Sequence, residues 1–167
     1  GKPSGKVSEK YNFKPNTPYA VAKHRLLNAI LKLKNKNNFK FTWLRPFFVY
    51  GLNDKRKTLF SIIKQIDKGK KIKVNVCGRL IRDFLSINYL SRVIYKVLIL
   101  DKNIGILNVC SGKKITVKNF IYKILTNKQK IKNIDMNGNN PNYFASDAFW
   151  GNSDKLKKIL KIKKKVF

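Results

Sequence analysis

Apolar residues recur every three or four positions in five parts of this chain, which is the spacing of one face of an α-helix. The pattern predicts helices over residues 17–34, 57–68, 88–100, 117–125 and 154–162. Thr17 is suited to cap the first of these helices, and Pro18 is suited to its first turn. The side chains that we expect this helix to turn inward are Ala22, Leu26, Ala29, Ile30 and Leu33.

Extended segments alternate with these helices. Strands are predicted over residues 39–45, 71–76, 81–87 and 105–109, which combine alternating polarity with β-branched and aromatic residues. Pro46 cannot donate to a central ladder, so we expect the first strand to end at Leu44 or Arg45. Residues 1–16 are predicted to be a surface loop, and residues 126–142 are polar and basic with no element assigned. The alternation of strands and helices predicts an α/β fold.

The charge of the chain is extreme, with a formal net value of +30 and 32 Lys against 6 Arg. One interpretation is a basic surface that binds nucleic acid. The other is a bias toward A/T-rich codons, since Lys, Asn and Ile are frequent and Ala is scarce. The Lys residues are spread along the whole chain, whereas a dedicated binder more often carries an Arg-rich cluster. We therefore expect no specific nucleic-acid partner, although anionic ligands such as phosphates would be attracted.

Several classes of protein are disfavoured by what the sequence lacks. Cys77, Cys110 and the single His24 cannot form a zinc set, so we expect no metal and two reduced thiols in a cytoplasmic protein. No apolar run approaches 18 residues, so no membrane span is expected. The chain starts without Met or an apolar leader, which favours a fragment or a processed chain. It also carries no glycine-rich loop of the kind that cradles phosphates.

Tyr19 and Lys23 lie four residues apart and should share one face of the first predicted helix. An ammonium beside a phenol favours the phenolate, which lowers the pKa of the Tyr and makes it a proton acceptor near neutral pH. In a chain so rich in Lys, seven Tyr would give about one such pair by chance, so the pair alone is a weak motif.

Further motifs follow this pair in a fixed order. In full, the motifs are Thr17-Pro18-Tyr19-Ala20-Val21-Ala22-Lys23, Leu44-Arg45-Pro46-Phe47-Phe48-Val49-Tyr50-Gly51, Gly78-x-x-x-Arg82-Asp83-Phe84 and Gly105-Ile106-Leu107-Asn108-Val109-Cys110-Ser111-Gly112. Their order and spacing resemble the C-terminal two-thirds of the extended short-chain dehydrogenase/reductases. These are the NAD(P)-dependent epimerases, dehydratases and reductases of sugar nucleotides. The resemblance runs from near the start of the chain to about Lys158.

The resemblance implies an incomplete Rossmann-type parallel sheet plus a small C-terminal substrate-binding α+β domain. Residues 1–51 would be the C-terminal part of the NAD(P)-binding Rossmann domain. Residues 52–167 would mainly form the substrate-binding domain, with the region 100–112 returning to the Rossmann sheet. The family's glycine-rich motif and its catalytic Ser or Thr would precede Gly1, so most of the NAD or NADP site is expected outside this chain.

The resemblance also implies a role for individual residues. Tyr19 would exchange a proton with a sugar hydroxyl, and Lys23 would lower the Tyr19 pKa and hold the nicotinamide ribose. The implied cofactor-binding residues are Tyr19, Lys23, Pro46, Phe47 and Val49. The implied substrate-binding residues are Phe48, Arg82 and Arg79. Arg82 would meet the nucleotide diphosphate, and Arg79 would be either a further phosphate contact or solvated surface.

Two segments depart from the family pattern, Leu52-Asn53-Asp54 and Ile87-Asn88-Tyr89, so the sequence selects no subfamily. The full-length protein is expected to be an NAD(P)-dependent sugar-nucleotide epimerase, dehydratase or reductase. Its partners would be a nucleotide-activated sugar and a second copy of itself in a homodimer. The isolated chain is expected to be inactive. An inactive fragment and a basic nucleic-acid-binding protein are the alternatives.

Overall fold

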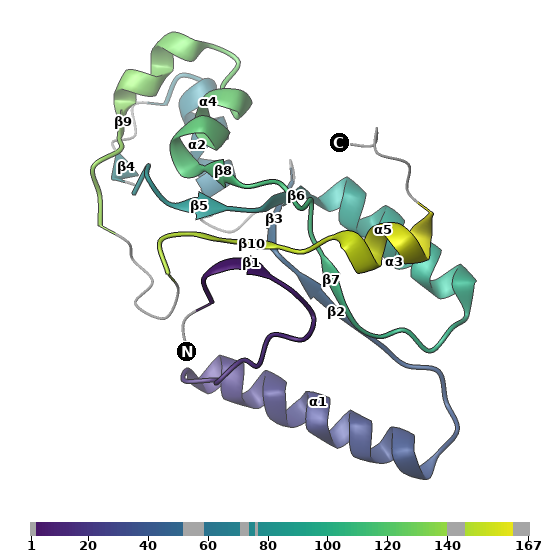
Figure 1. Ribbon diagram of the computed structural model, residues 1–167. Coiled ribbons are helices and arrows are strands. Elements are labelled where there is room, and N and C mark those ends of the chain that lie inside the picture. Colours follow the sequence, from purple (N-terminus) through teal and green to yellow (C-terminus); the bar gives the residue numbers. More distant parts are fainter. Residues whose placement is uncertain (1–2, 52–58, 71–73, 76, 140–145, 162–167) are drawn as a thin grey trace.

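The computed structural model describes the chain except for residues 1–2, 52–58, 71–73, 76, 140–145 and 162–167 (Figure 1). The helices are α1 (Pro18–Lys36), α2 (Leu59–Asp67), α3 (Ile87–Leu100), α4 (Val117–Ile124), α5 (Asp154–Leu160) and the 3₁₀-helix η1 (Lys128–Asn133). The strands are β1 (Gly5–Val7), β2 (Thr42–Pro46), β3 (Phe48–Tyr50), β4 (Val74–Asn75), β5 (Ile81–Arg82), β6 (Phe84–Ser86), β7 (Gly105–Val109), β8 (Ile115–Thr116), β9 (Ile134–Asp135) and β10 (Phe149–Gly151).

The described strands pair two by two, as β1–β10, β2–β7, β3–β6, β4–β9 and β5–β8. These pairs are parallel except for the antiparallel β5–β8. The longest pair, β2–β7, sets Thr42 opposite Gly105 and Pro46 opposite Val109. Parallel neighbours need long crossover connections, which here carry the helices. The predicted α/β fold is therefore confirmed.

Two apolar clusters hold the elements together. The first lies between α2 and α4 and includes Ile63, Ile66, Ile121, Leu125 and Ile134. The second lies between α3, α5 and β7 and includes Leu85, Val93, Leu107, Val109 and Leu156. Figure 1 shows the first cluster's helices at the upper left and the second cluster's helices at the right. Within the described residues, no helix combines the length and the apolar character needed to span a bilayer.

The first helix begins as predicted but turns a different face inward. Thr17 Oγ1 accepts a hydrogen bond from Ala20 N at 3.2 Å, and α1 starts at Pro18. Leu27 is its buried side chain. The residues that were expected to face inward but are exposed are Ala22, Leu26, Ala29 and Leu33. Adjacent residues are rotated by about 100° around a helix, so the buried face that contains Leu27 differs from the predicted face that contains Leu26. The prediction was wrong for these four residues, whereas Ile30 is half-buried. Apolar residues lie on more than one face of α1, and hydrophobic spacing alone does not show which face is buried.

Several strands escaped the sequence pattern. Residues 1–16 were predicted to be a loop but contain β1. Residues 126–142, to which no element was assigned, contain η1 and β9, and β10 lies beyond them. Val7 in β1 is 1% exposed, because β1 pairs with β10. The strand predicted over residues 81–87 is split at Asp83 into β5 and β6. Residues 71–73 and 76 of another predicted strand lie outside the described residues, and β4 covers Val74–Asn75.

Pro46 also differs from the prediction. It is the last residue of β2 instead of lying beyond the strand. Phe47 N resumes the hydrogen bonding by donating to Val109 O at 3.1 Å. A strand can tolerate Pro at its end, where few ladder bonds depend on its missing N–H.

Candidate active site

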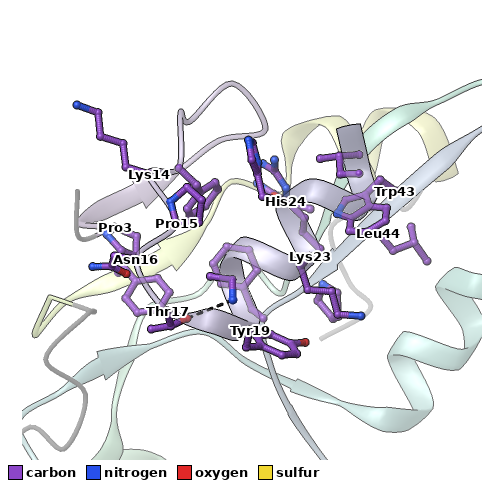
Figure 2. Close-up of a pocket in the computed structure, with 18 of the residues that line it drawn as sticks. Pro3, Lys14, Pro15, Asn16, Thr17, Tyr19, Lys23, His24, Trp43 and Leu44 are labelled. Carbon is purple, nitrogen blue, oxygen red and sulfur yellow. Dashed lines mark hydrogen bonds between the residues drawn. The ribbon is translucent and has the colours of Figure 1, made fainter. Parts of the chain in front are cut away.

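A cavity of about 980 Å³ opens between α1, the loop before α1 and the β2–β3 segment. Its polar lining includes Asn16, Thr17, Tyr19, Lys23, His24, Arg45 and Asn108. Its apolar lining includes Phe13, Leu27, Trp43, Leu44, Pro46, Phe47, Phe48 and Phe149. Figure 2 shows the α1 residues Tyr19 and Lys23 on one side, with Trp43 and Leu44 of β2 nearby. A concave, largely apolar space of this size with a few polar groups is typical of small-molecule sites.

Tyr19 and Lys23 lie one helical turn apart on the cavity wall. The Lys23 ammonium sits 5.7 Å from the centre of the Tyr19 ring. Tyr19 is 73% exposed, so its side chain is accessible to a ligand. The Thr17 cap, drawn as a dashed bond in Figure 2, fixes the helix two residues before Tyr19. The structure thus brings together the two residues that the sequence singled out for proton transfer.

Arg45 adds a half-buried cation to the same cavity. Its Nη1 donates to Glu9 O at 3.3 Å, and its guanidinium lies 4.9 Å from the centre of the Phe13 ring. Burial lowers the Arg45 pKa, and the nearby charge of Glu9 partly restores it. The Glu9 carboxylate also accepts from Asn108 N at 3.0 Å. These contacts tie the segment before α1 to β2 and β7, and so they fix one side of the cavity.

The segment after Arg45 divides between the cavity and the core. Pro46, Phe47 and Phe48 line the cavity, where the sequence placed cofactor and substrate contacts. Val49 does not line the cavity, because it packs against the apolar cluster of α3, α5 and β7. Successive residues of a strand point to opposite faces, which is why Phe48 and Val49 separate.

The two arginines expected at the substrate lie outside the cavity lining. Arg82 is 4% exposed, and its Nη1 donates to Ile81 O at 2.8 Å and to Asp147 O at 3.0 Å. Burial lowers the Arg82 pKa, and the charge of Asp147 partly restores it. Arg79 is an exposed residue whose Nε lies 3.7 Å from an Asp147 carboxylate oxygen. Both cations therefore meet protein partners instead of open cavity.

Asp83 is a buried residue that stands in the third sequence motif, but the sequence assigned it no role. Its carboxylate accepts from Ser111 N (2.8 Å), Ser111 Oγ (2.7 Å), Gly112 N (2.9 Å) and Gly151 N (3.2 Å). Burial raises the Asp83 pKa, and the hydrogen bonds from these donors counteract that rise. The carboxylate thus joins the β5–β6 junction to the loop after β7 and to β10.

Phe149 is a second residue that the sequence did not single out. It lies in β10 and lines the cavity, although it is 130 residues beyond Tyr19 in the chain. The only available signal was the aromatic run Phe149-Trp150-Gly151 in a segment with no assigned element.

Comparison with known proteins identifies the relatives of this chain. The family that matches, over residues 1–110, is the NAD dependent epimerase/dehydratase family. A dTDP-6-deoxy-L-talose 4-dehydrogenase (NAD(+)) of Aggregatibacter actinomycetemcomitans is 27% identical over 113 residues, which are 66% of this chain and 42% of that protein.

Solved structures match over the whole described fold. UDP-glucose 4-epimerase of Thermotoga maritima, solved with UDP-glucose, matches this chain with a TM-score of 0.83 at 18% sequence identity. The match covers all of this chain and 54% of the epimerase. UDP-glucuronic acid 4-epimerase of Bacillus cereus, solved with NAD, has a TM-score of 0.76 at 25% identity, with 52% of its length matched.

The chain therefore spans about half the length of these structures. Their likeness confirms the expected Rossmann-type α/β architecture. Because the family match covers residues 1–110, the chain belongs to the NAD dependent epimerase/dehydratase family.

Proposed function

We propose that this chain supplies the substrate-side part of an enzyme that epimerises, dehydrates or oxidises a nucleotide-activated sugar with NAD. The observation that carries the proposal is the placement of Tyr19 and Lys23 one turn apart on the wall of the cavity. Family membership and the sugar-nucleotide enzymes among the structural neighbours support the same chemistry.

In this proposal Tyr19 exchanges a proton with a sugar hydroxyl. As a C–H bond of the sugar gives up its hydride, the hydroxyl proton on the same carbon passes to the Tyr19 oxygen, so the alcohol becomes a ketone. Lys23, whose ammonium lies 5.7 Å from the centre of the Tyr19 ring, would hold the ribose of the cofactor. NAD, when bound, would accept the hydride from the sugar carbon.

The cavity residues fit such a cofactor in part. Lys23 offers a cation with hydrogen-bond donors, and Pro46 and Phe47 offer an apolar wall on which a flat ring can lie. The sequence carries no glycine-rich loop for the cofactor's phosphates. We therefore propose that catalysis requires a further polypeptide segment that provides this loop, and that the 167-residue chain alone does not turn over.

Replacing Tyr19 by Phe in the full-length protein that carries this chain tests the proposal. The exchange removes the hydroxyl and keeps the ring, so the turnover of a panel of nucleotide sugars with NAD should fall by about 10²–10⁴-fold. Tyr95→Phe is the matched control, because Tyr95 is exposed on α3 and does not line the cavity. Unchanged turnover in Tyr19→Phe would rule out proton transfer by Tyr19.

A further inference from the structure

Three neighbouring phenylalanine rings line part of the cavity, and we call them the aromatic platform: Phe47, Phe48 and Phe149. The rings of Phe48 and Phe149 lie 5.6 Å apart between centres, and those of Phe47 and Phe149 lie 6.3 Å apart. They come from the β2–β3 segment and from β10, which are about one hundred residues apart in sequence. Phe48 is 37% exposed, so the platform is open to a ligand.

The platform separates Arg82 from the cavity. The Arg82 guanidinium carbon lies 4.8 Å from the Phe149 ring centre and 5.5 Å from the Phe48 ring centre. Phe48 and Phe149 line the cavity, whereas Arg82 does not. A ligand at the platform therefore meets aromatic faces, and the cation on their far side holds the two rings in place by cation–π attraction.

Backbone contacts fix the platform before any ligand arrives. Phe47 N donates to Val109 O at 3.1 Å, and Phe48 N donates to Asp83 O at 3.1 Å. A Cβ placed on Gly151 would lie 2.4 Å from Cys110 Sγ and 3.0 Å from the Phe47 ring, so the glycine lets β10 lie close to both residues. A wall held in this way loses little conformational entropy when it binds a ligand.

The cavity lining thus offers two kinds of contact. Polar groups come from the start of α1 (Tyr19, Lys23, His24) and from Arg45 and Asn108, while the platform offers no hydrogen bond from its side chains. A hydroxyl pressed against the platform would lose its hydrogen bonds to water, whereas a methyl group would gain by burial. A ligand that suits both kinds of contact has hydroxyls for the polar groups and an apolar substituent for the platform.

We propose that the aromatic platform makes the site selective for nucleoside diphosphate 6-deoxyhexoses over hexoses that carry a 6-hydroxyl. The inference rests on the proposed function and adds the substrate class. Phe48 and Phe149 contact the C6 methyl group, and the hydroxyls of the sugar ring face Tyr19 and Lys23. A difference of one hydroxyl at an apolar wall corresponds to a preference of about 10–100-fold.

The test uses the full-length protein that carries this chain and two substrates that differ only at O6, a dTDP-hexose and its 6-deoxy counterpart. The wild-type kcat/KM should favour the 6-deoxy sugar by about tenfold or more. Phe149→Ala and Phe48→Asn should each reduce this preference toward one. Phe84→Leu is the control, because Phe84 contacts Phe48 but does not line the cavity. It should keep the preference.

The outcomes separate the two proposals. Equal kcat/KM values for the two sugars in the wild type would overturn the platform's selectivity and leave the proposed function standing. An unchanged preference in folded Phe48→Asn protein would also overturn it, and this variant serves if Phe149→Ala does not fold. Failure of the wild type to act on either sugar, or on any nucleotide sugar of the panel, would overturn both.

Discussion

Replacing Asp83 by Asn should lower the free energy of unfolding by about 2–4 kcal/mol. The exchange keeps the size of the side chain, so packing stays nearly constant. It replaces one acceptor oxygen by an NH₂ group, which can only donate. Asp83 is fully buried, so water cannot compensate for a lost partner.

The magnitude follows from the donors around the carboxylate. In the wild type one oxygen serves Ser111, and the other serves Gly112 N at 2.9 Å and Gly151 N at 3.2 Å. With the amide in either orientation, at least one backbone N–H faces another donor. Each buried polar group left unpaired costs about 1–3 kcal/mol. Part of this loss is offset, because burial raises the Asp83 pKa and Asn avoids the desolvation of a charge.

Urea unfolding of the 167-residue chain, followed by circular dichroism, measures the change. Asp154→Asn is the control. Asp154 is an exposed carboxylate paired with Lys6 at 3.4 Å, so its loss should change stability by no more than about 1 kcal/mol. If Asp83→Asn cost less than about 0.5 kcal/mol, with an unchanged denaturant slope, the four hydrogen bonds would not be what joins β5, β6 and β10.

Gly112 lies in the loop that Asp83 holds, and Cys110 directly follows the strand before that loop. Gly112→Ala should destabilise the chain by about 2 kcal/mol or more, because its φ is +74° and the new Cβ would lie 2.3 Å from Ser153 Oγ. Gly69→Ala, at φ +91° with open space, should cost only about 1 kcal/mol, and equal urea midpoints would contradict the steric argument. Burial raises the pKa of the Cys110 thiol, so iodoacetamide at pH 8 should alkylate this thiol at least about 100-fold more slowly in the folded chain than in urea. Mass spectrometry of the Cys110 peptide measures both alkylation rates. Equal rates would refute the burial of Cys110.

Local patterns predicted the helices well because each helix carries its own signal. Thr17, Ser86 and Thr116 each accept a hydrogen bond from a backbone N–H three residues on, so the starts of α1, α3 and α4 are set by neighbours in sequence. The pair of Tyr19 and Lys23 was predictable for the same reason, since helical spacing alone puts both on one side.

The remaining parts of the site depend on contacts that no local pattern contains. β1 and β10 are three residues long and are stabilised by each other, across 144 positions from Gly5 to Phe149. Arg82 and Phe48 were both expected at the substrate, but the rings that cover Arg82 come from β3 and β10. The position of these two rings decides whether Arg82 reaches the cavity, and this position depends on contacts between distant strands that the local sequence around Arg82 does not show.

The β1–β10 pair has a consequence for how the chain acquires its site. Contacts between distant positions form late, because the chain between them must first give up its conformational freedom. Gly5 is among the first described residues, whereas Phe149 stands close to the end of the sequence. During synthesis the α1 side of the cavity is therefore made early, and the wall that contains Phe149 is added only when the C-terminal segment docks. A nascent chain shortened before residue 149 would keep Tyr19 and Lys23 but would lack the part of the cavity lining that β10 supplies.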